Sequence, residues 1–104
     1  MVTQARVRRL ALDLPEAVEQ DHHGRPSFRV GGRIFATLWD EGHVNVMLEP
    51  QRIEALSSEH VGMCVPVWWG RRLAALRIDL EEATPGVVAL LLEEAWRRRS
   101  AVAG

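Results

Sequence analysis

The residues of this chain that could do chemistry are its arginines, its four histidines and a single cysteine. All 13 basic residues are arginine and none is lysine. The planar guanidinium of arginine makes bidentate contacts with phosphate and carboxylate groups and stacks on aromatic rings, whereas the lysine ammonium is a compact point charge. Genomic base composition would produce the same bias without any functional cause.

Five arginines are the candidate nucleic-acid-binding residues. Arg33, Arg71 and Arg72 are predicted at the tips of two β-hairpins, where guanidinium groups can hold phosphates or enter a minor groove. Arg29 and Arg77 are expected to support them from the strands. The formal net charge of -1 counts against this interpretation, because a nucleic-acid-binding domain is usually basic.

Asp21-His22-His23 is the one cluster of titratable residues that suggests a metal or proton-transfer site. Two adjacent ligands cannot complete a tetrahedral site, and His43, His60 and Cys64 follow at no recognised ligand spacing. We therefore expect no metal and no cofactor. Cys64, among Met63 and Val65, is expected to be a small core residue instead of a nucleophile.

No catalytic motif is present in the sequence. Gly31-Gly32 lies between two predicted strands, whereas a phosphate-binding loop leads from a strand into a helix. Neither a Gly-x-Ser-x-Gly elbow nor a His-Glu-x-x-His pair occurs. Neighbouring carboxylates such as Glu81-Glu82 and Glu93-Glu94 point apart and read as solvated faces. We expect a protein that is not an enzyme.

Length and composition favour one small domain over residues 1–104. The chain has 104 residues, 47% of them apolar and 26% charged, which is enough for one core. The longest apolar run, residues 87–92, is far shorter than the roughly 20 residues of a membrane span. Residues 1–15 lack the apolar segment of a secretory signal, and one cysteine cannot form an internal disulfide. We expect a cytoplasmic protein without a membrane partner.

Hydrophobic periodicity predicts the elements that must position these residues. In chain order they are a helix over about 3–13, a helical turn at 16–20, a polar loop at 21–26, strands at 27–30, 33–39 and 44–48, a helix at 50–58, strands at 65–69 and 73–80, and a helix that starts at Thr84-Pro85 and ends in Arg97-Arg98-Arg99. Segregated hairpins and covering helices indicate an α+β domain with a five-stranded antiparallel sheet.

Strand alternation divides the sheet residues between two faces. The set expected to face the helices is aliphatic except for one tryptophan: Ile34, Ala36, Leu38, Val44, Val46, Leu48, Val65, Val67, Trp69, Leu76, Ile78 and Leu80. The opposite set mixes polar groups with Phe35, Trp39, Met47 and Trp68. If the helices cover one side only, these four form an exposed partner-binding patch; if a helix folds over them, they are buried.

Two sequence segments resemble the MmcQ/YjbR family. They are Leu14-Pro15-Glu16-Ala17 and GRPSFRVGGRIFA at 24–36, and the likeness continues through Val44-Asn45-Val46 to residues 91–97. The resemblance implies an α-β(3)-α-β(2)-α fold, similar to secretion chaperones, with a "double wing" arrangement and a DNA-binding label. It supplies no catalytic residues. The chain departs from the family pattern with Arg33 where lysine is common and with His22-His23 where an aromatic residue often precedes the glycine.

Three functions remain open from the sequence. The first is a nucleic-acid-binding module that uses the arginine-tipped hairpins, with DNA as the partner. The second is a protein-interaction module, with another protein or a second copy seated on the aromatic face. The third is a pocket for a small apolar ligand lined by the same aromatic side chains.

Overall fold

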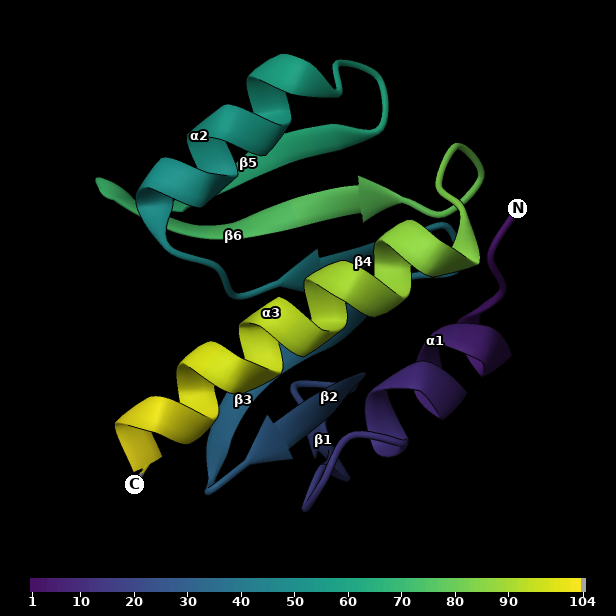
Figure 1. Ribbon diagram of the computed structural model, residues 1–104, viewed down its shortest axis with the longest axis vertical. Helices are drawn as coiled ribbons and strands as arrows, with labels where there is room; N and C mark the ends of the chain where they lie inside the picture. The colour runs from purple at the N-terminus through teal and green to yellow at the C-terminus, as the bar shows by residue number, and fades with distance from the viewer. Residues whose placement is uncertain (104) are drawn as a thin grey trace.

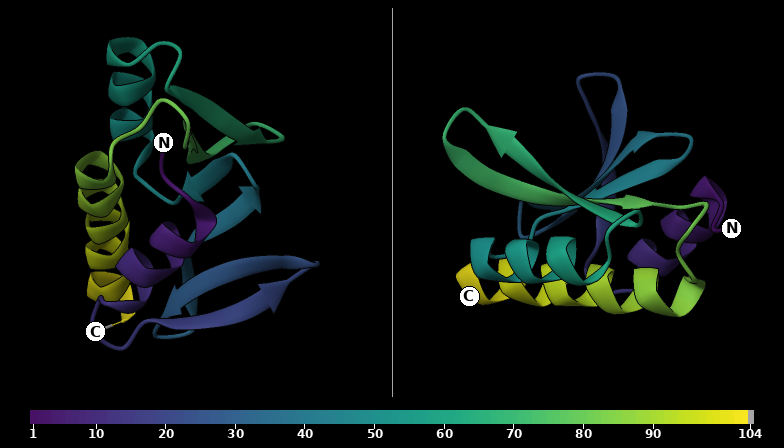
Figure 2. Two further views of the ribbon diagram at one scale, coloured as in Figure 1. Left: turned by 90° about the vertical axis from the view of Figure 1, so that its right-hand side faces the viewer. Right: turned by 90° about the horizontal axis from the view of Figure 1, so that it is seen from above.

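Three helices gather on one face of a single antiparallel sheet (Figures 1 and 2). The structure is a computed structural model that describes the backbone of residues 1–103 and the side chains of residues 1–101. Its elements are α1 (Gln4–Leu12), β1 (Val18–His22), β2 (Arg25–Val30), β3 (Arg33–Asp40), β4 (His43–Val46), α2 (Pro50–Glu59), β5 (Cys64–Trp69), β6 (Arg72–Asp79) and α3 (Pro85–Ala103).

The sheet has six strands in the order β1-β2-β3-β4-β6-β5, and every neighbouring pair is antiparallel. The α+β class and the antiparallel sheet predicted from the sequence are confirmed. The prediction of three strands between the first two helices is wrong by one strand. Residues 18–22 form a fourth strand, β1, where a helical turn and a loop were predicted. His23 and Gly24 have φ of 54° and 84°, the type I′ geometry of a tight hairpin, so β1 pairs directly with β2.

The long helix α3 holds the two layers together. Thr84 Oγ1 accepts a hydrogen bond from the Val87 N–H at 3.3 Å, which confirms the predicted N-cap. The helix packs across β2, β3 and β4 and against α1, while α2 covers β5 and β6. At its C-terminal end, Arg98 Nη1 donates to the Met47 carbonyl and Arg99 Nε donates to the Ile34 carbonyl. These bonds fix the last turn of α3 at the end of the sheet.

The core fills the space between the helices and the sheet. Its largest fully buried side chains are Phe28, Phe35, Leu38, Leu48, Ile53, Leu76, Ile78, Leu80 and Leu92. Cys64 is buried at the start of β5, as predicted, and burial raises the pKa of its thiol. No helix in the described part of the chain is long and apolar enough to cross a membrane.

A β-bulge reverses the predicted side of Phe35. Phe28 pairs with Ala36 and Arg29 pairs with Ile34, so Phe35 is an extra residue on β3. Phe35 and Ala36 therefore both point into the core, and Phe35 is 0% exposed. The sequence prediction that placed Phe35 on the open face is wrong, because regular alternation cannot anticipate the inserted residue.

The face assignment of β5 is wrong along its length. Pro66 pairs with Leu76, and Trp68 pairs with Leu73, so both lie on the helix side of the sheet. Trp69 and its alternate neighbours Val65 and Val67 lie on the open face instead. β5 is an edge strand whose residues are almost all apolar, so its hydrophobic pattern does not distinguish one face from the other.

We expect Phe35→Ala to lower the free energy of unfolding by about 3–5 kcal/mol, because it leaves a cavity in the core. Trp68→Ala removes a larger side chain, but one that is 55% exposed, and should cost roughly 1 kcal/mol or less. Urea unfolding followed by circular dichroism measures both. Equal losses would contradict the bulge at Phe35.

Candidate functional site

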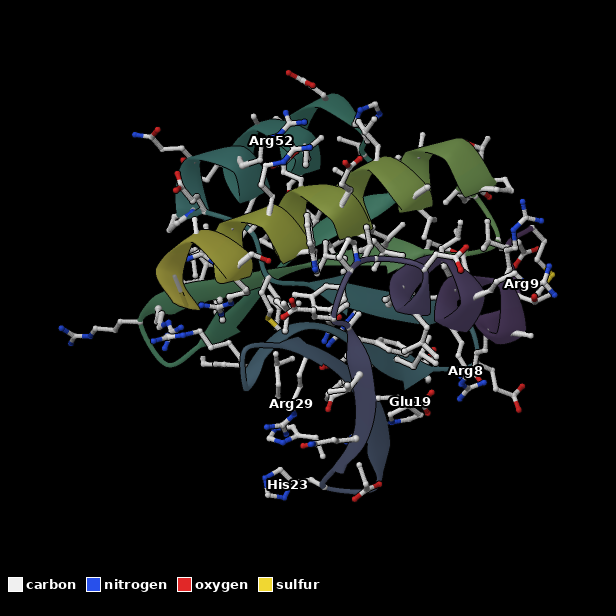
Figure 3. All side chains as sticks on the ribbon, turned by 60° about the horizontal axis from the view of Figure 1, so that its bottom comes forward. Arg8, Arg9, Glu19, His23, Arg29 and Arg52 are labelled. Atoms are coloured by element: carbon white, nitrogen blue, oxygen red, sulfur yellow. The ribbon has the colours of Figure 1, made fainter. Side chains whose placement is uncertain are left out.

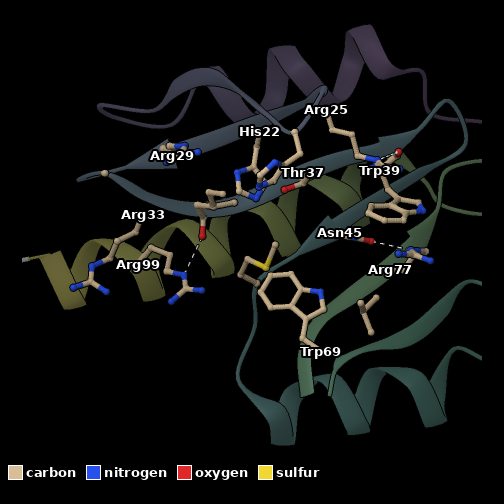
Figure 4. Close-up of a pocket in the computed structure, with 15 residues that line it drawn as sticks. His22, Arg25, Arg29, Arg33, Thr37, Trp39, Asn45, Trp69, Arg77 and Arg99 are labelled. Carbon is tan, nitrogen blue, oxygen red and sulfur yellow. Dashed lines mark hydrogen bonds between the residues drawn. The ribbon is translucent and has the colours of Figure 1, made fainter. Parts of the chain in front are cut away.

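The face of the sheet that the helices leave open is hollowed into a cleft of about 520 Å³ (Figure 4). The β1–β2 and β5–β6 hairpins project away from the helix layer on either side of the sheet (Figure 2). The cleft is lined by His22, His23, Arg25, Arg29, Gly32, Arg33, Ile34, Thr37, Trp39, Asn45, Met47, Val67, Trp69, Arg77 and Arg99. Five of these residues are arginine, and they come from β2, β3, β6 and α3.

At one end of the cleft, the indole of Trp39 lies between two guanidinium groups (Figure 4). The Arg25 guanidinium carbon is 3.8 Å from the ring centroid and that of Arg77 is 4.4 Å away. Arg25 Nε donates to the Trp39 carbonyl at 2.9 Å, and Arg77 Nε donates to Asn45 Oδ1 at 2.9 Å. Burial lowers the pKa of Arg77, the nearby carboxylate of Asp40 raises it in part, and the charge of Arg25 lowers it. Cation–π contacts offset part of this cost and hold both cations in place.

At the other end, four arginines crowd together. Arg99 is held by its bond to the Ile34 carbonyl at 3.0 Å, and Arg33 lines the cleft beside it (Figure 4). Burial lowers the pKa of Arg99, and the charges of Arg98, Arg72 and Arg33 lower it further because like charges disfavour the cation. An arginine remains protonated at neutral pH under such shifts, so this end of the cleft is strongly positive.

None of the cleft-lining side chains within residues 1–101 is a carboxylate. Three arginine–carboxylate pairs among the described side chains lie elsewhere: Arg8–Glu19, Arg52–Glu94 and Arg97–Glu93. Figure 3 shows Arg8 beside Glu19, and Arg52 on the helix layer, apart from Arg29 and His23 on the β1–β2 hairpin. The cleft lining itself therefore holds no carboxylate counter-ion, and Asp40, outside the lining, favours the charged form of Arg77.

A row of polar side chains crosses the sheet at the level of the cleft floor. Ser27 pairs with Thr37, Thr37 with Asn45, and Asn45 with Arg77 on successive strands. Ser27, Thr37 and Asn45 are the buried polar residues of the described chain. Ser27 Oγ donates to the Gln20 carbonyl at 2.8 Å and accepts from Arg29 Nε at 3.4 Å. Buried polar groups need partners, and Ser27 and Asn45 find theirs in neighbouring groups of the protein.

The two adjacent histidines lie at the rim of the cleft. Their rings are in edge contact, with centroids 4.5 Å apart, at the tip of the β1–β2 hairpin. Within the described residues, no three His, Cys, Asp or Glu side chains come close enough together to hold a metal ion. Asp40 lies outside the cleft lining, and a hydrogen bond from His43 lowers the pKa of its carboxyl group.

The structure brings three of the five predicted arginines into the cleft: Arg29, Arg33 and Arg77. Arg72 lies just outside, with its guanidinium 5.8 Å from the ring of Trp69. Arg71 is exposed at the hairpin tip and does not line the cleft. Two arginines of the cleft were not predicted: Arg25, which falls in the segment expected to be a loop, and Arg99, whose place depends on how α3 crosses the sheet.

The predicted partner-binding patch does not form as one surface. Trp39 and Met47 line the cleft, but Phe35 is in the core and Trp68 is on the helix side of β5. Trp69, which was placed on the wrong face, takes the position expected for Trp68. The bulge at Phe35 and the ambiguous pattern of β5 are the physical reasons for both corrections.

Comparison with known proteins supports the fold described above. A sequence model of the YjbR family matches residues 12–98. The crystal structure of protein DR2400 from Deinococcus radiodurans, described as a DUF419 domain, is similar with a TM-score of 0.77 and 20% sequence identity. The match covers 91% of this chain and 76% of that protein. No curated protein matches the chain significantly.

We expect millimolar tripolyphosphate at constant ionic strength to raise the melting temperature, because a polyanion bound to the cleft stabilises the folded state. At a concentration about tenfold above Kd, the shift should be about 4 °C or more. Arg99→Gln should reduce the shift. Arg97→Gln, two residues earlier on α3 and ion-paired with Glu93, is the matched control and should retain it. Equal shifts in both variants, measured by differential scanning fluorimetry, would place the anion elsewhere.

Proposed function

We propose that this chain, which belongs to the YjbR family, is a non-enzymatic module that binds nucleic acid in the arginine-lined cleft of its sheet. The observation that carries the proposal is the convergence of five guanidinium groups from four elements on one cleft whose described lining holds no carboxylate. The sequence hypothesis placed the contacts at the hairpin tips. The proposal moves them to the open face of the sheet.

Charge segregation supports a polyanionic ligand despite the net charge of -1. On β1, Glu19 points to the helix side and bonds to Arg8, whereas His22 lines the cleft. On α3, Glu93 and Glu94 pair with Arg97 and Arg52, away from Arg99. These acidic residues balance the total charge from outside the cleft lining. A locally positive concave surface of this kind attracts phosphate groups.

The way the arginines are held also favours phosphate recognition. In Arg25, Arg77 and Arg99, Nε donates to a neutral oxygen of the protein. Each bond fixes the plane of the guanidinium and leaves its terminal nitrogens for a ligand. Oriented guanidinium groups make charge-assisted, bidentate hydrogen bonds to phosphate oxygens.

The protein-interaction alternative loses the surface on which it was based. Its four residues divide between the core, the cleft and the helix side of the sheet. We propose no catalysed reaction for the cleft. The location that we propose for the protein is the cytoplasm, as expected from the sequence.

We expect the triple variant Arg25→Gln, Arg33→Gln, Arg77→Gln to weaken binding of a short oligonucleotide by roughly 100-fold at low salt, since charge-assisted hydrogen bonds are lost at three positions. The slope of log K against log salt should become shallower by about 2. Fluorescence anisotropy at several salt concentrations measures both quantities.

The matched control replaces Arg6, Arg9 and Arg97 with glutamine. These three arginines are exposed and lie on α1 and α3, so the variant has the same net charge as the cleft variant. It should bind within about twofold of the unmodified protein. If both variants lose affinity equally, binding follows net charge and not the cleft; if the unmodified protein retains no oligonucleotide at micromolar concentration and low salt, the proposed function is wrong.

A further inference from the structure

We propose that the cleft receives an unpaired strand, with a base stacked on Trp69 and a phosphate held between Arg33 and Arg99. The inference rests on the proposed function and specifies its substrate class as single-stranded nucleic acid. It is carried by three features of the cleft: the neighbouring Arg33 and Arg99 (Figure 4), the exposed indole of Trp69, and apolar side chains in the lining.

The two indoles of the cleft have different roles. Trp39 lies between Arg25 and Arg77, so its ring is already in contact with protein cations. Trp69 is 54% exposed while lining the cleft, and its one cation–π neighbour, Arg72, is 5.8 Å from the ring. A large exposed aromatic ring beside a row of cations is the arrangement that stacks unpaired bases. Trp69 is therefore the stacking platform, and Trp39 positions two arginines.

The cleft lining also contains apolar side chains. Besides the two indoles, these are Ile34, Met47 and Val67. A charged phosphate group has no favourable interaction with apolar side chains. The flat ring of a base, in contrast, can cover them and remove their apolar surface from water. The cleft volume of about 520 Å³ is within the range of pockets that enclose small ligands, which a splayed nucleotide can enter.

The floor offers hydrogen bonds to the edge of a base. Asn45 is 4% exposed, and Arg77 Nε donates to its Oδ1. This bond fixes the amide so that its NH₂ group is the free donor. The Thr37 hydroxyl is its cross-strand neighbour and lines the same cleft. The Watson–Crick edge of a base is accessible to these groups only when the base is unpaired.

The position of the arginines disfavours a duplex. Arg25, Arg29, Arg77 and Arg99 are half-buried within the hollow instead of projecting from a convex surface. A duplex keeps its bases stacked on each other and presents a stiff outer backbone. A flexible single strand can place successive phosphates into the cleft while it leaves a base on Trp69.

The test compares three probes at one salt concentration: an oligodeoxythymidine of about eight nucleotides, a blunt duplex of the same length, and thymidine monophosphate. We expect the single strand to bind at least about tenfold more tightly than either of the others. Trp69→Ala should weaken single-strand binding roughly 5- to 100-fold, the range of one lost base stack.

Trp68→Ala is the matched control, because Trp68 is the adjacent residue of the same strand with nearly equal exposure, 55%, on the other face. It should leave affinity unchanged. Circular dichroism and the melting temperature of both variants confirm that each is folded.

The outcomes separate this inference from the proposed function. Duplex binding as tight as single-strand binding, or equal effects of the two tryptophan variants, overturns the inference and leaves nucleic-acid binding intact. Thymidine monophosphate binding as tightly as the oligonucleotide overturns it in favour of a nucleotide pocket. Failure to bind any of the three probes overturns the proposed function itself.

Discussion

All features of the cleft depend on the fact that the helices cover only one face of a twisted six-stranded sheet. α3 crosses β2, β3 and β4, and α2 covers β5 and β6, so the apolar side chains of the sheet have one direction in which to be buried. The hairpins at both ends of the sheet project away from the helices and make the uncovered face concave (Figure 2). Packing against the helices stabilises the sheet, and the open face is therefore free to carry polar and charged groups.

Strand alternation converts this one-sided packing into a separation of charge. Residues of one strand point alternately to the helices and to the cleft, so a single strand can supply Glu19 to Arg8 on one side and His22 to the cleft on the other. By the same rule, the pair Asn45 and Arg77 lies on the open face of the sheet, while the adjacent pair Val44 and Ile78 lies in the core on the helix side. A nearly neutral chain thus presents a cationic surface, and net charge alone is a poor guide to its ligand.

The sequence was sufficient for most of the fold but not for the site. Glycine residues mark the hairpin turns, because few other residues adopt a positive φ. Proline marks the first turn of a helix, because its fixed φ suits that position. β1 was not predicted, because Val18–His22 is exposed along most of its length and has no alternation of apolar and polar residues. The bulge at Phe35 is a local insertion that no period reveals. Arg25 and Arg99 are 74 positions apart in the numbering, and only the path of α3 across the sheet brings both into one cleft.

The polar row on the cleft floor is the feature hardest to explain by stability alone. An aliphatic residue at Thr37 or Asn45 would fit the β-sheet and avoid the cost of burying a hydroxyl or an amide. Asn45 instead holds Arg77 against Trp39, and Trp39 in turn accepts a hydrogen bond from Arg25. The row therefore holds Arg77 close to Arg25, whose charge lowers the pKa of Arg77, while the carboxylate of Asp40, outside the cleft lining, offsets part of this effect. An anionic ligand would therefore meet guanidinium groups that the protein already holds in place, and such preorganisation increases affinity.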